Sequence, residues 1–341
     1  MFVESGVLKE TLHRLAAGTN LTSEEAADAT GEIMDGAATP AQIAAFLTAL
    51  RMKGETVDEI TGCARAMRRR AVRVDGGPGV ILDTCGTGGD GLGTFNISTV
   101  SAIVAAACGA RVAKHGNRAA SSKCGSSDLL EALGVRIENP KEKIEKILQE
   151  VGIAYLHAPN FHPAMKHAGP VRKELGFRTI FNLLGPLCNP AGANAQVVGI
   201  FAPALVRPIA EVLRALGSSH AFTFHGHGGL DELSTTGDNR AVELTGGAIT
   251  DVTIGPGSIG VPTATAADLA GGDAAANAAI ARDILAGTKG PKRDIVVLNA
   301  AVALVAAGQA KTPREGAQKA AEALDSGAAK KKLDQLVAAS Q

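Results

Sequence analysis

The first seventy residues have a helical pattern of apolar positions. Leu8, Leu12 and Leu15 fall on one face at helical spacing. Three capping boxes follow, in which a threonine precedes a glutamate or glutamine by three residues: Thr22–Glu25, Thr39–Gln42 and Thr56–Glu59. This pattern predicts a small helical bundle. Its last helix ends in three arginines, residues 68–70, which we expect to be a solvated helix end favoured by the helix dipole, with an anion site as the alternative.

A different pattern begins after a glycine-rich linker at residues 74–79. Short apolar runs predict strands at 80–82, 111–113, 153–156 and 221–224, and longer periodic runs predict helices at 97–108, 128–133 (capped by Ser127), 141–151 and 204–216. Such alternation is typical of an α/β domain with a mostly parallel central sheet. We therefore expect a small helical domain at 1–74, joined by parts of 160–190, and a large α/β domain at 75–341. Residues 321–341 are expected to form a surface helix with a frayed end.

Composition narrows the possible partners and compartment. Lysine plus arginine equals aspartate plus glutamate at 34 each, and aromatic residues make up only 3% of the chain. We therefore expect no nucleic-acid partner, and the apolar runs are too short for a membrane span. The N-terminal charges Glu4, Lys9 and Glu10 do not fit a signal peptide. Five cysteines without CxxC spacing favour a reducing cytoplasm and argue against a zinc site.

The sequence DTCGTGGDG at residues 83–91, followed by TFNIST at 94–99, is the strongest candidate for chemistry. It lies between a predicted strand and a predicted helix. Glycines allow backbone N–H groups to approach a ligand closely, and the helix start attracts anions. The arrangement fits a phosphate or diphosphate. Asp90 would repel that ligand unless a metal or a ribose lies between them.

Other polar clusters also follow predicted strands. Residues 114–122, KHGNRAASS, could hold a second phosphate or be an ordinary solvated loop. Asp231 and Glu232 could bind Mg²⁺ through oxygen ligands, or merely favour a helix dipole. Arg172, His162 and His167 alone would be ordinary surface residues. Because ligands bind at the carboxyl ends of parallel strands, we expect the strand-end clusters to share one rim of the sheet.

Together these motifs resemble the anthranilate phosphoribosyltransferase family over about residues 5–330. They are GTGGD at 86–90, NIST at 96–99, KHGNR at 114–118, HPAM at 162–165, RTIFNLLGP at 178–186 and GLDE at 229–232. The resemblance implies a nucleoside phosphorylase/phosphoribosyltransferase-like fold and a homodimer formed through the helical domain. It also implies the second step of tryptophan biosynthesis. In that step, anthranilate displaces diphosphate from 5-phosphoribosyl 1-diphosphate, with Mg²⁺ as cofactor.

The resemblance also implies residue roles. Phosphoribosyl diphosphate would contact Gly86, Gly89, Asp90, Thr94, Asn96, Ile97, Ser98, Thr99, Lys114, His115, Gly116, Asn117, Arg118, Ala119, Ala120, Ser121, Ser122 and Ser126. Anthranilate would contact Gly86, Asn117 and Arg172, with His115, His162 and Pro186 along its path. Mg²⁺ would be held by Ser98, Asp231 and Glu232. No residue is assigned as a catalytic acid or base, because the aromatic amine is already neutral at pH 7. Loops 114–122 and 160–176 are expected to close over the substrates.

Two cysteines depart from the family pattern, and three other functions are considered. Cys85 and Cys124 could be activated thiols near Lys114, or inert buried residues, which we favour. A pyrimidine nucleoside phosphorylase shares the architecture, but residues 122–126 only faintly match its glycine loop. A nucleic-acid-binding relative should be basic and lack the acidic pair. A dinucleotide-binding protein would need GxGxxG, and residues 86–89 do not fit that spacing.

Overall fold

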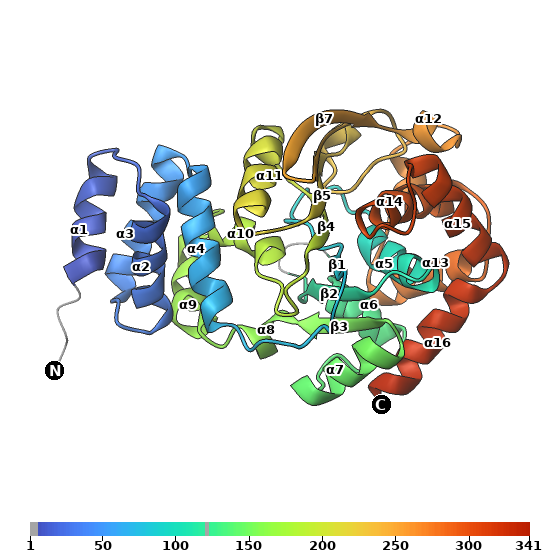
Figure 1. The fold of residues 1–341 in the computed structure, drawn as a ribbon, viewed down its shortest axis with the longest axis horizontal. Coiled ribbons are helices and arrows are strands. Elements are labelled where there is room, and N and C mark those ends of the chain that lie inside the picture. Colours follow the sequence, from blue (N-terminus) through green and yellow to red (C-terminus); the bar gives the residue numbers. More distant parts are fainter. Residues whose placement is uncertain (1–5, 120–122) are drawn as a thin grey trace.

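A small helical bundle forms one end of the molecule (Figure 1). The computed structural model describes residues 6–119 and 123–341. The bundle contains α1 (Gly6–Ala16), α2 (Ser23–Met34), α3 (Pro40–Lys53) and α4 (Val57–Arg70). All three predicted capping boxes are present, at Thr22, Thr39 and Thr56. The prediction of a helical bundle is therefore confirmed.

A later part of the chain returns to this bundle. It comprises α9 (Met165–Leu175), α10 (Phe181–Leu184) and the 3-10 turn η1 (Gly185–Leu187). Val171 and Leu184 from this part share a buried core with Phe46, Leu47 and Ile60 of the bundle. Segments more than a hundred residues apart in sequence thus form one apolar core.

Of the arginines at the end of α4, Arg69 is exposed, whereas Arg68 and Arg70 have protein partners. Arg68 donates from Nε to the carbonyl of Leu187 at 2.6 Å and from a terminal nitrogen to the carbonyl of Leu216 at 3.2 Å. Arg70 forms an ion pair with Asp35. The expectation of a solvated side chain was wrong for Arg68, because the returning segment and the α/β domain bring backbone carbonyls against it. Arg68 thereby fastens the bundle to the rest of the molecule.

A seven-stranded sheet forms the centre of the large domain. Its order is β3-β2-β1-β4-β5-β6-β7. The strands are β1 (Leu82–Asp83), β2 (Val112–Gly116), β3 (Ile153–His157), β4 (Ala195–Gly199), β5 (His220–His225), β6 (Asn239–Thr245) and β7 (Ala248–Ile254). The first five strands in the order are mutually parallel, and β6 and β7 continue antiparallel. The predicted mostly parallel sheet is confirmed.

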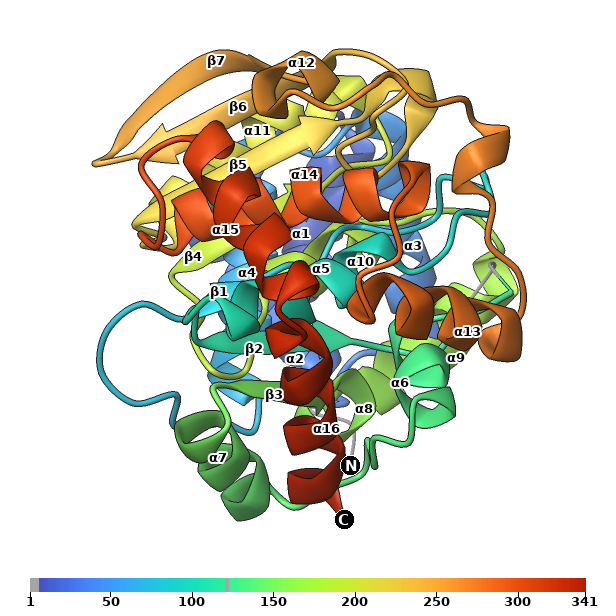
Figure 2. The same cartoon turned by 90° about the vertical axis from the view of Figure 1, so that its right-hand side faces the viewer.

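Helices cover both faces of the sheet. One face is covered by α5 (Ile97–Ala107) and α14 (Pro291–Ala306), with α13 (Ala274–Leu285), α15 (Pro313–Asp325) and α16 (Ala328–Ser340) outside them (Figures 1 and 2). Helix α11 (Val206–Ala215) lies between the sheet and α4 (Figure 1). Both α5 and α14 are buried along most of their length, which explains their apolar sequences.

The remaining elements are short. They are α6 (Ser126–Ala132), α7 (Lys141–Glu150), α8 (Ala158–Phe161) and α12 (Pro256–Ile259), with 3-10 turns η2 (Pro203–Leu205), η3 (His227–Gly229) and η4 (Ala267–Leu269). Among the described residues, no helix is both long enough and apolar enough to cross a bilayer.

Three local predictions were wrong in detail. Strand β2 runs to Gly116, so Lys114 and His115 lie within the strand instead of after it. Ser127 lies inside α6, and the carboxylate of Asp128 accepts from the N–H of Gly125 at the cap. Helix α16 is not a loose surface helix, because its Leu333 and Leu336 are buried and Ser340 accepts from the N–H of Arg136 at 3.0 Å.

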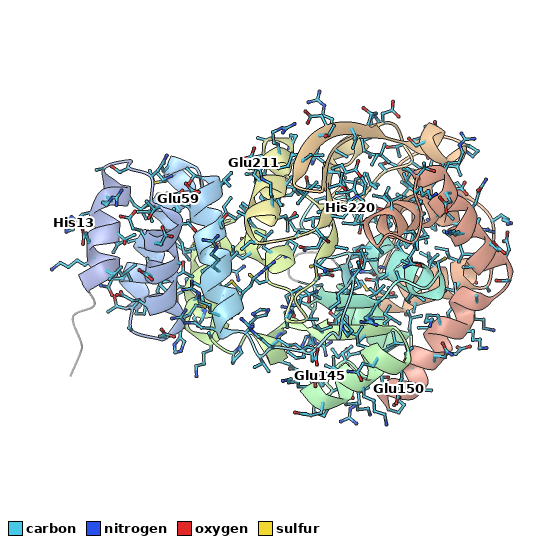
Figure 3. The ribbon with its side chains drawn as sticks, in the orientation of Figure 1. His13, Glu59, Glu145, Glu150, Glu211 and His220 are labelled. Atoms are coloured by element: carbon cyan, nitrogen blue, oxygen red, sulfur yellow. The ribbon has the colours of Figure 1, made fainter. Side chains whose placement is uncertain are left out.

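One capping residue also holds the bundle together. Glu59 is fully buried, and its carboxylate accepts from the N–H groups of Leu21 (3.0 Å) and Thr56 (2.8 Å) and from Lys53 (2.9 Å) (Figure 3). Glu59→Ala should lower the free energy of unfolding by about 2–4 kcal/mol, because it leaves buried donors without partners. Gln42→Ala removes only a cap and should cost about 1 kcal/mol. Urea unfolding measures both, and equal losses would contradict a tertiary role for Glu59.

Candidate active site

The glycine loop after β1 is anchored to the end of β4. The backbone N–H of Thr87 donates to the carbonyl of Gly199 at 2.8 Å. The Thr87 hydroxyl donates to the same carbonyl at 3.2 Å and accepts from the N–H of Phe201 at 3.0 Å. The loop therefore lies at the carboxyl edge of the sheet, where the sequence placed it.

Close backbone packing at this edge requires glycine at two positions. A Cβ on Gly199 would lie 1.7 Å from the carbonyl oxygen of Asp231, and a Cβ on Gly86 would lie 3.0 Å from the carbonyl oxygen of Gly199. Any side chain at Gly199 would push away the segment that carries Asp231. The glycine motif indicated Gly86 as a site residue, but nothing in the sequence singled out Gly199 except its position at the end of an apolar run.

Three acidic residues, Asp90, Asp231 and Glu232, lie near the loop, although their carboxylate oxygens do not all lie within 4.8 Å of one another. Glu232 Oε1 accepts from the N–H of Ser98 at 3.0 Å, in the first turn of α5. The N–H of Asp231 donates to Asp90 Oδ2 at 3.4 Å. Burial, followed by repulsion from Glu232 and Asp90, raises the pKa of Asp231. Burial also raises the pKa of Glu232, against attraction to Lys114. The structure thus places Glu232 against the first turn of α5 at Ser98, with Asp231 adjacent to it in the chain.

Lys114 contributes a buried positive charge to this region. Its side chain is 4% exposed, and Nζ donates to the carbonyl and the hydroxyl of Thr84 at 3.2 and 3.3 Å. Attraction to Lys114 partly offsets the effect of burial on the pKa values of Asp83 and Glu232. The ammonium group therefore lies close to both the glycine loop and the acidic pair.

The predicted residues at the start of α5 have two kinds of environment. Ile97 and Thr99 are buried and pack the helix start in place. Asn96 is held by its side chain, which donates to the carbonyl of Cys124 at 3.0 Å and accepts from Asn277 at 3.0 Å. Thr94 pairs with Ala270 in an isolated bridge. These contacts fix the helix start from a segment that lies far along the chain.

Two asparagines that position the site were missed from the sequence. Asn277 on α13 orients Asn96. Asn299 on α14 accepts from the N–H of Leu233 at 3.0 Å and donates to its carbonyl at 2.8 Å, immediately after the acidic pair. Both side chains are buried. In each case the sequence offers one clue: an asparagine among apolar residues in a predicted helix. A buried amide needs polar partners, so such a residue indicates contact with a polar segment elsewhere in the chain.

Residues 117–119, just after β2, contact α6. Arg118 forms ion pairs with Asp128 and Glu131 of that helix, and the N–H of Ala119 donates to Asp128. The Ser126 hydroxyl donates to the carbonyl of Asn117 at 3.2 Å. A Cβ on Gly116 would lie 2.2 Å from Ser126 Oγ, so the end of β2 is close to α6. The predicted residues Ala120, Ser121 and Ser122 lie outside the described residues.

Arg172 lies on α9 with its guanidinium 5.2 Å from the ring centre of Phe181. Burial lowers the pKa of Arg172, and within residues 6–119 and 123–341 it forms no ion pair. The same segment reaches the glycine loop through Arg178, which donates to the carbonyl of Gly89 and stacks 4.2 Å from the ring centre of Phe201. Arg178 therefore connects the α9 segment with the predicted phosphate loop.

The cysteines near the site are not activated thiols. Burial raises the pKa of Cys85 to about 12 and also raises the pKa of Cys124. Cys124 donates to Asn96 Oδ1 at 3.2 Å. Cys124 is buried and Cys85 is half-buried, and the raised pKa values support the interpretation of both as unactivated thiols. None of the cysteines described forms a disulfide.

Comparison with known proteins shows the family to which the chain belongs. Residues 78–330 match the glycosyl transferase family, a/b domain, and residues 9–71 match its helical bundle domain. Over 97% of its length the chain is 55% identical to the anthranilate phosphoribosyltransferase of Moorella thermoacetica, covering 98% of that protein. The chain belongs to the anthranilate phosphoribosyltransferase family. Another relative of that name, from Geobacter sulfurreducens, is 51% identical, with 97% of this chain and 99% of the relative covered.

Solved structures of anthranilate phosphoribosyltransferases have the same fold. The enzyme from Thermus thermophilus superposes with a TM-score of 0.91 at 46% identity, covering 96% of this chain and 98% of that one. The enzyme from Saccharomyces cerevisiae in complex with PRPP and Mg has a TM-score of 0.91 at 29% identity, covering 100% and 99%. The predicted combination of a helical domain and a larger α/β domain is confirmed for this family member.

The acidic cluster of this anthranilate phosphoribosyltransferase fits a magnesium ion. Mg²⁺ prefers oxygen ligands, and the cluster offers carboxylates whose mutual repulsion and burial raise the pKa of Asp231. A bound cation would relieve that repulsion. The donor set contains the hydroxyl of Ser98 as well, at the residue whose N–H already contacts Glu232.

The same repulsion should make the metal-free protein sensitive to pH. Because the folded pKa of Asp231 is raised, the folded protein holds that proton more tightly than the unfolded chain, so stability falls as pH rises above about 4. Asp231→Asn should raise the free energy of unfolding in chelator at pH 8 by about 1 kcal/mol after screening, and by less at pH 5. Asp334→Asn, on the exposed side of α16, is the control. A gain independent of pH would contradict this explanation.

Proposed function

We propose that the rim formed by the glycine loop, the start of α5 and the acidic pair transfers the phosphoribosyl group of 5-phosphoribosyl 1-diphosphate to the amine of anthranilate. The products are N-(5-phosphoribosyl)anthranilate and diphosphate, in the second step of tryptophan biosynthesis from chorismate. The observation that carries the proposal is the contact of Glu232 with the Ser98 N–H beside the glycine loop. This contact joins a candidate metal ligand, Glu232, to a helix N-terminus of the kind that binds phosphate.

The donor site is assigned to Gly86, Gly89, Asp90, Thr94, residues 96–99, residues 114–122 and Ser126. Backbone N–H groups at the start of α5, with Asn96 and Ser98, hold phosphate oxygens, and Lys114 supplies a compact positive charge. Asp231, Glu232 and Ser98 hold Mg²⁺, which stabilises the charge of the leaving diphosphate. Relatives support this assignment: the Saccharomyces cerevisiae enzyme is described in complex with PRPP and Mg.

The acceptor site is assigned to Gly86, Asn117 and Arg172. The guanidinium of Arg172 has no carboxylate partner among the described residues, so it is available to pair with the anthranilate carboxylate in a bidentate geometry. The aromatic amine needs no base to expose its lone pair. Positioning of the two substrates and stabilisation of the leaving group therefore supply the catalysis.

The organisation of the chain around this site is also proposed. Residues 1–74, with parts of 160–190, form a helical domain, and 75–341 form the donor-binding domain. The outer helices of the bundle expose Val7 (42%) and Met52 (83%), which fits a homodimer formed through the helical domain. A tryptophan-pathway enzyme with free thiol chemistry fits the cytoplasm.

The decisive experiment follows anthranilate fluorescence with the purified chain and phosphoribosyl diphosphate, with and without Mg²⁺. The chain contains no tryptophan, so its own emission interferes little. The expected result is a loss of anthranilate fluorescence that requires both the donor and Mg²⁺. No loss with a correctly folded protein would refute the proposed activity, and a loss without Mg²⁺ would refute the role of the acidic cluster.

Arg172 offers the sharpest test of the acceptor site. Arg172→Ala should lower kcat/KM for anthranilate by about 1.5–3 kcal/mol, because one charge-assisted interaction is lost, and should change the donor KM much less. Lys173→Ala, at the adjacent exposed position, should change neither value. Equal losses for the two substrates would contradict the carboxylate assignment. Initial rates at varied concentrations of each substrate give both constants.

A further inference from the structure

A second cluster of metal-ligating side chains lies on the other face of β1 and β2. We propose that Asp83, Cys85 and His115 form a binding site for a thiophilic divalent cation of the Zn²⁺ class, with His162 as the candidate fourth ligand. Their ligand atoms, a carboxylate oxygen, Sγ and an imidazole nitrogen, all lie within 4.8 Å of one another. The ring centre of His162 lies 5.1 Å from that of His115.

The sheet itself assembles this cluster. Strands β1 and β2 are parallel neighbours, with Leu82 opposite Val112. Alternation along the two chains places Asp83, Cys85 and His115 on one face. Thr84 and Lys114 fall on the opposite face, where the Lys114 ammonium donates to Thr84. The Lys114 ammonium thus lies on the opposite face, although its charge still attracts the carboxylate of Asp83.

Both histidines are prepared as neutral metal ligands. His115 Nδ1 lies 3.1 Å from the carbonyl of Gly185; a carbonyl only accepts, so Nδ1 carries the hydrogen and Nε2 keeps its lone pair. The backbone of Cys188 acts on the ring of His162 in the same sense, since it raises the pKa of His162 against the effect of burial. The Nε2 atoms of both rings are buried without a hydrogen-bond partner among the described residues, in side chains only 3% and 7% exposed. Metal-bound histidines usually show this anchoring of the second nitrogen.

The protonation states of the four groups fit a soft metal. Burial lowers the pKa of His115 to about 3 and that of His162 to about 4, so both imidazoles are neutral at pH 7. Burial raises the pKa of Asp83 to about 6, which leaves it mostly ionised at pH 7. Coordination would displace the Cys85 proton to solvent, giving a thiolate. Tetrahedral Zn²⁺ takes ligand bonds of about 2.0–2.3 Å. The three ligand atoms, which lie within 4.8 Å of one another, would draw closer, and His162, which lies outside that group, would move toward them.

The ligand chemistry separates this site from the acidic cluster. Thiolate and imidazole favour Zn²⁺ and similar metals, whereas Asp231 and Glu232 offer only oxygen, which suits Mg²⁺. His115 belongs to β2 of the sheet, and His162 lies in the turn between α8 and α9. A bound cation would fasten the α9 segment, which carries Arg172, to the sheet. Because Arg172 would then be held in place, we expect the bound cation to inhibit turnover. That expectation rests on the proposed function, but the proposal that the cation binds does not rest on it.

Cobalt(II) titration of the chelator-treated full chain tests binding directly. Co²⁺ should give one equivalent of a thiolate-to-metal charge-transfer band with tetrahedral visible bands, and Zn²⁺ should abolish both. Cys85→Ala should lose the charge-transfer band and bind at least about 10-fold more weakly. Cys108→Ala is the matched control, because that half-buried thiol lies at the far end of α5 and donates to the carbonyl of Lys319. It should retain the full spectrum.

Several results would overturn the proposal. They are the absence of a thiolate band in the parent chain, its persistence in Cys85→Ala, or its loss in Cys108→Ala. If Cys85→Ala does not fold by circular dichroism, the parent spectrum still decides thiolate ligation, and His162→Gln tests the fourth ligand by a changed visible band. Zn²⁺ inhibition of turnover, absent in Cys85→Ala, is measured separately. A chain that binds Co²⁺ but shows no turnover would refute only the proposed function.

Discussion

One hydrogen bond joins the two halves of the site: the N–H of Ser98 donates to the carboxylate of Glu232 at 3.0 Å. The donor belongs to the first turn of the helix after the glycine loop, and the acceptor lies 134 residues later in the chain. A helix start attracts a negative charge, and here the protein itself provides one. A bound phosphate and the Glu232 carboxylate would therefore compete for the same positive helix start. A cation between them would offset the repulsion of their two negative charges.

Much of the surrounding structure keeps that contact in place. The missing side chain at Gly199 lets the Asp231 carbonyl approach, and Thr87 ties the glycine loop to the same strand end. Asn299 holds the backbone just beyond the acidic pair, and Asn277 holds Asn96 at the helix start. Burial, and then repulsion from Glu232 and Asp90, raises the pKa of Asp231, so the contact is held despite an unfavourable environment for negative charge.

The sequence predicted those parts of the molecule that depend on local chemistry. The three capping boxes fixed the helix starts at Thr22, Thr39 and Thr56, and the glycine loop could be recognised between a strand and α5. The short strand β4 and the hairpin β6–β7 were missed, because they depend on neighbours in the sheet more than on their own pattern. Arg68 was misjudged because its partners are backbone carbonyls from distant segments. His115 and His162 could be named, but no spacing in the chain indicates that their rings lie 5.1 Å apart.

Asn299 carries a consequence for how such chains vary over evolutionary time. It binds no substrate in the proposed mechanism, and the signature motifs of the family all end before it. A gene that kept each of those motifs but lost the last fifty codons would still be recognised by them, although its acidic pair would no longer be held. The part of the gene needed for function is therefore longer than the motifs that identify it. It includes α14, whose buried Asn299 holds the backbone beside the acidic pair.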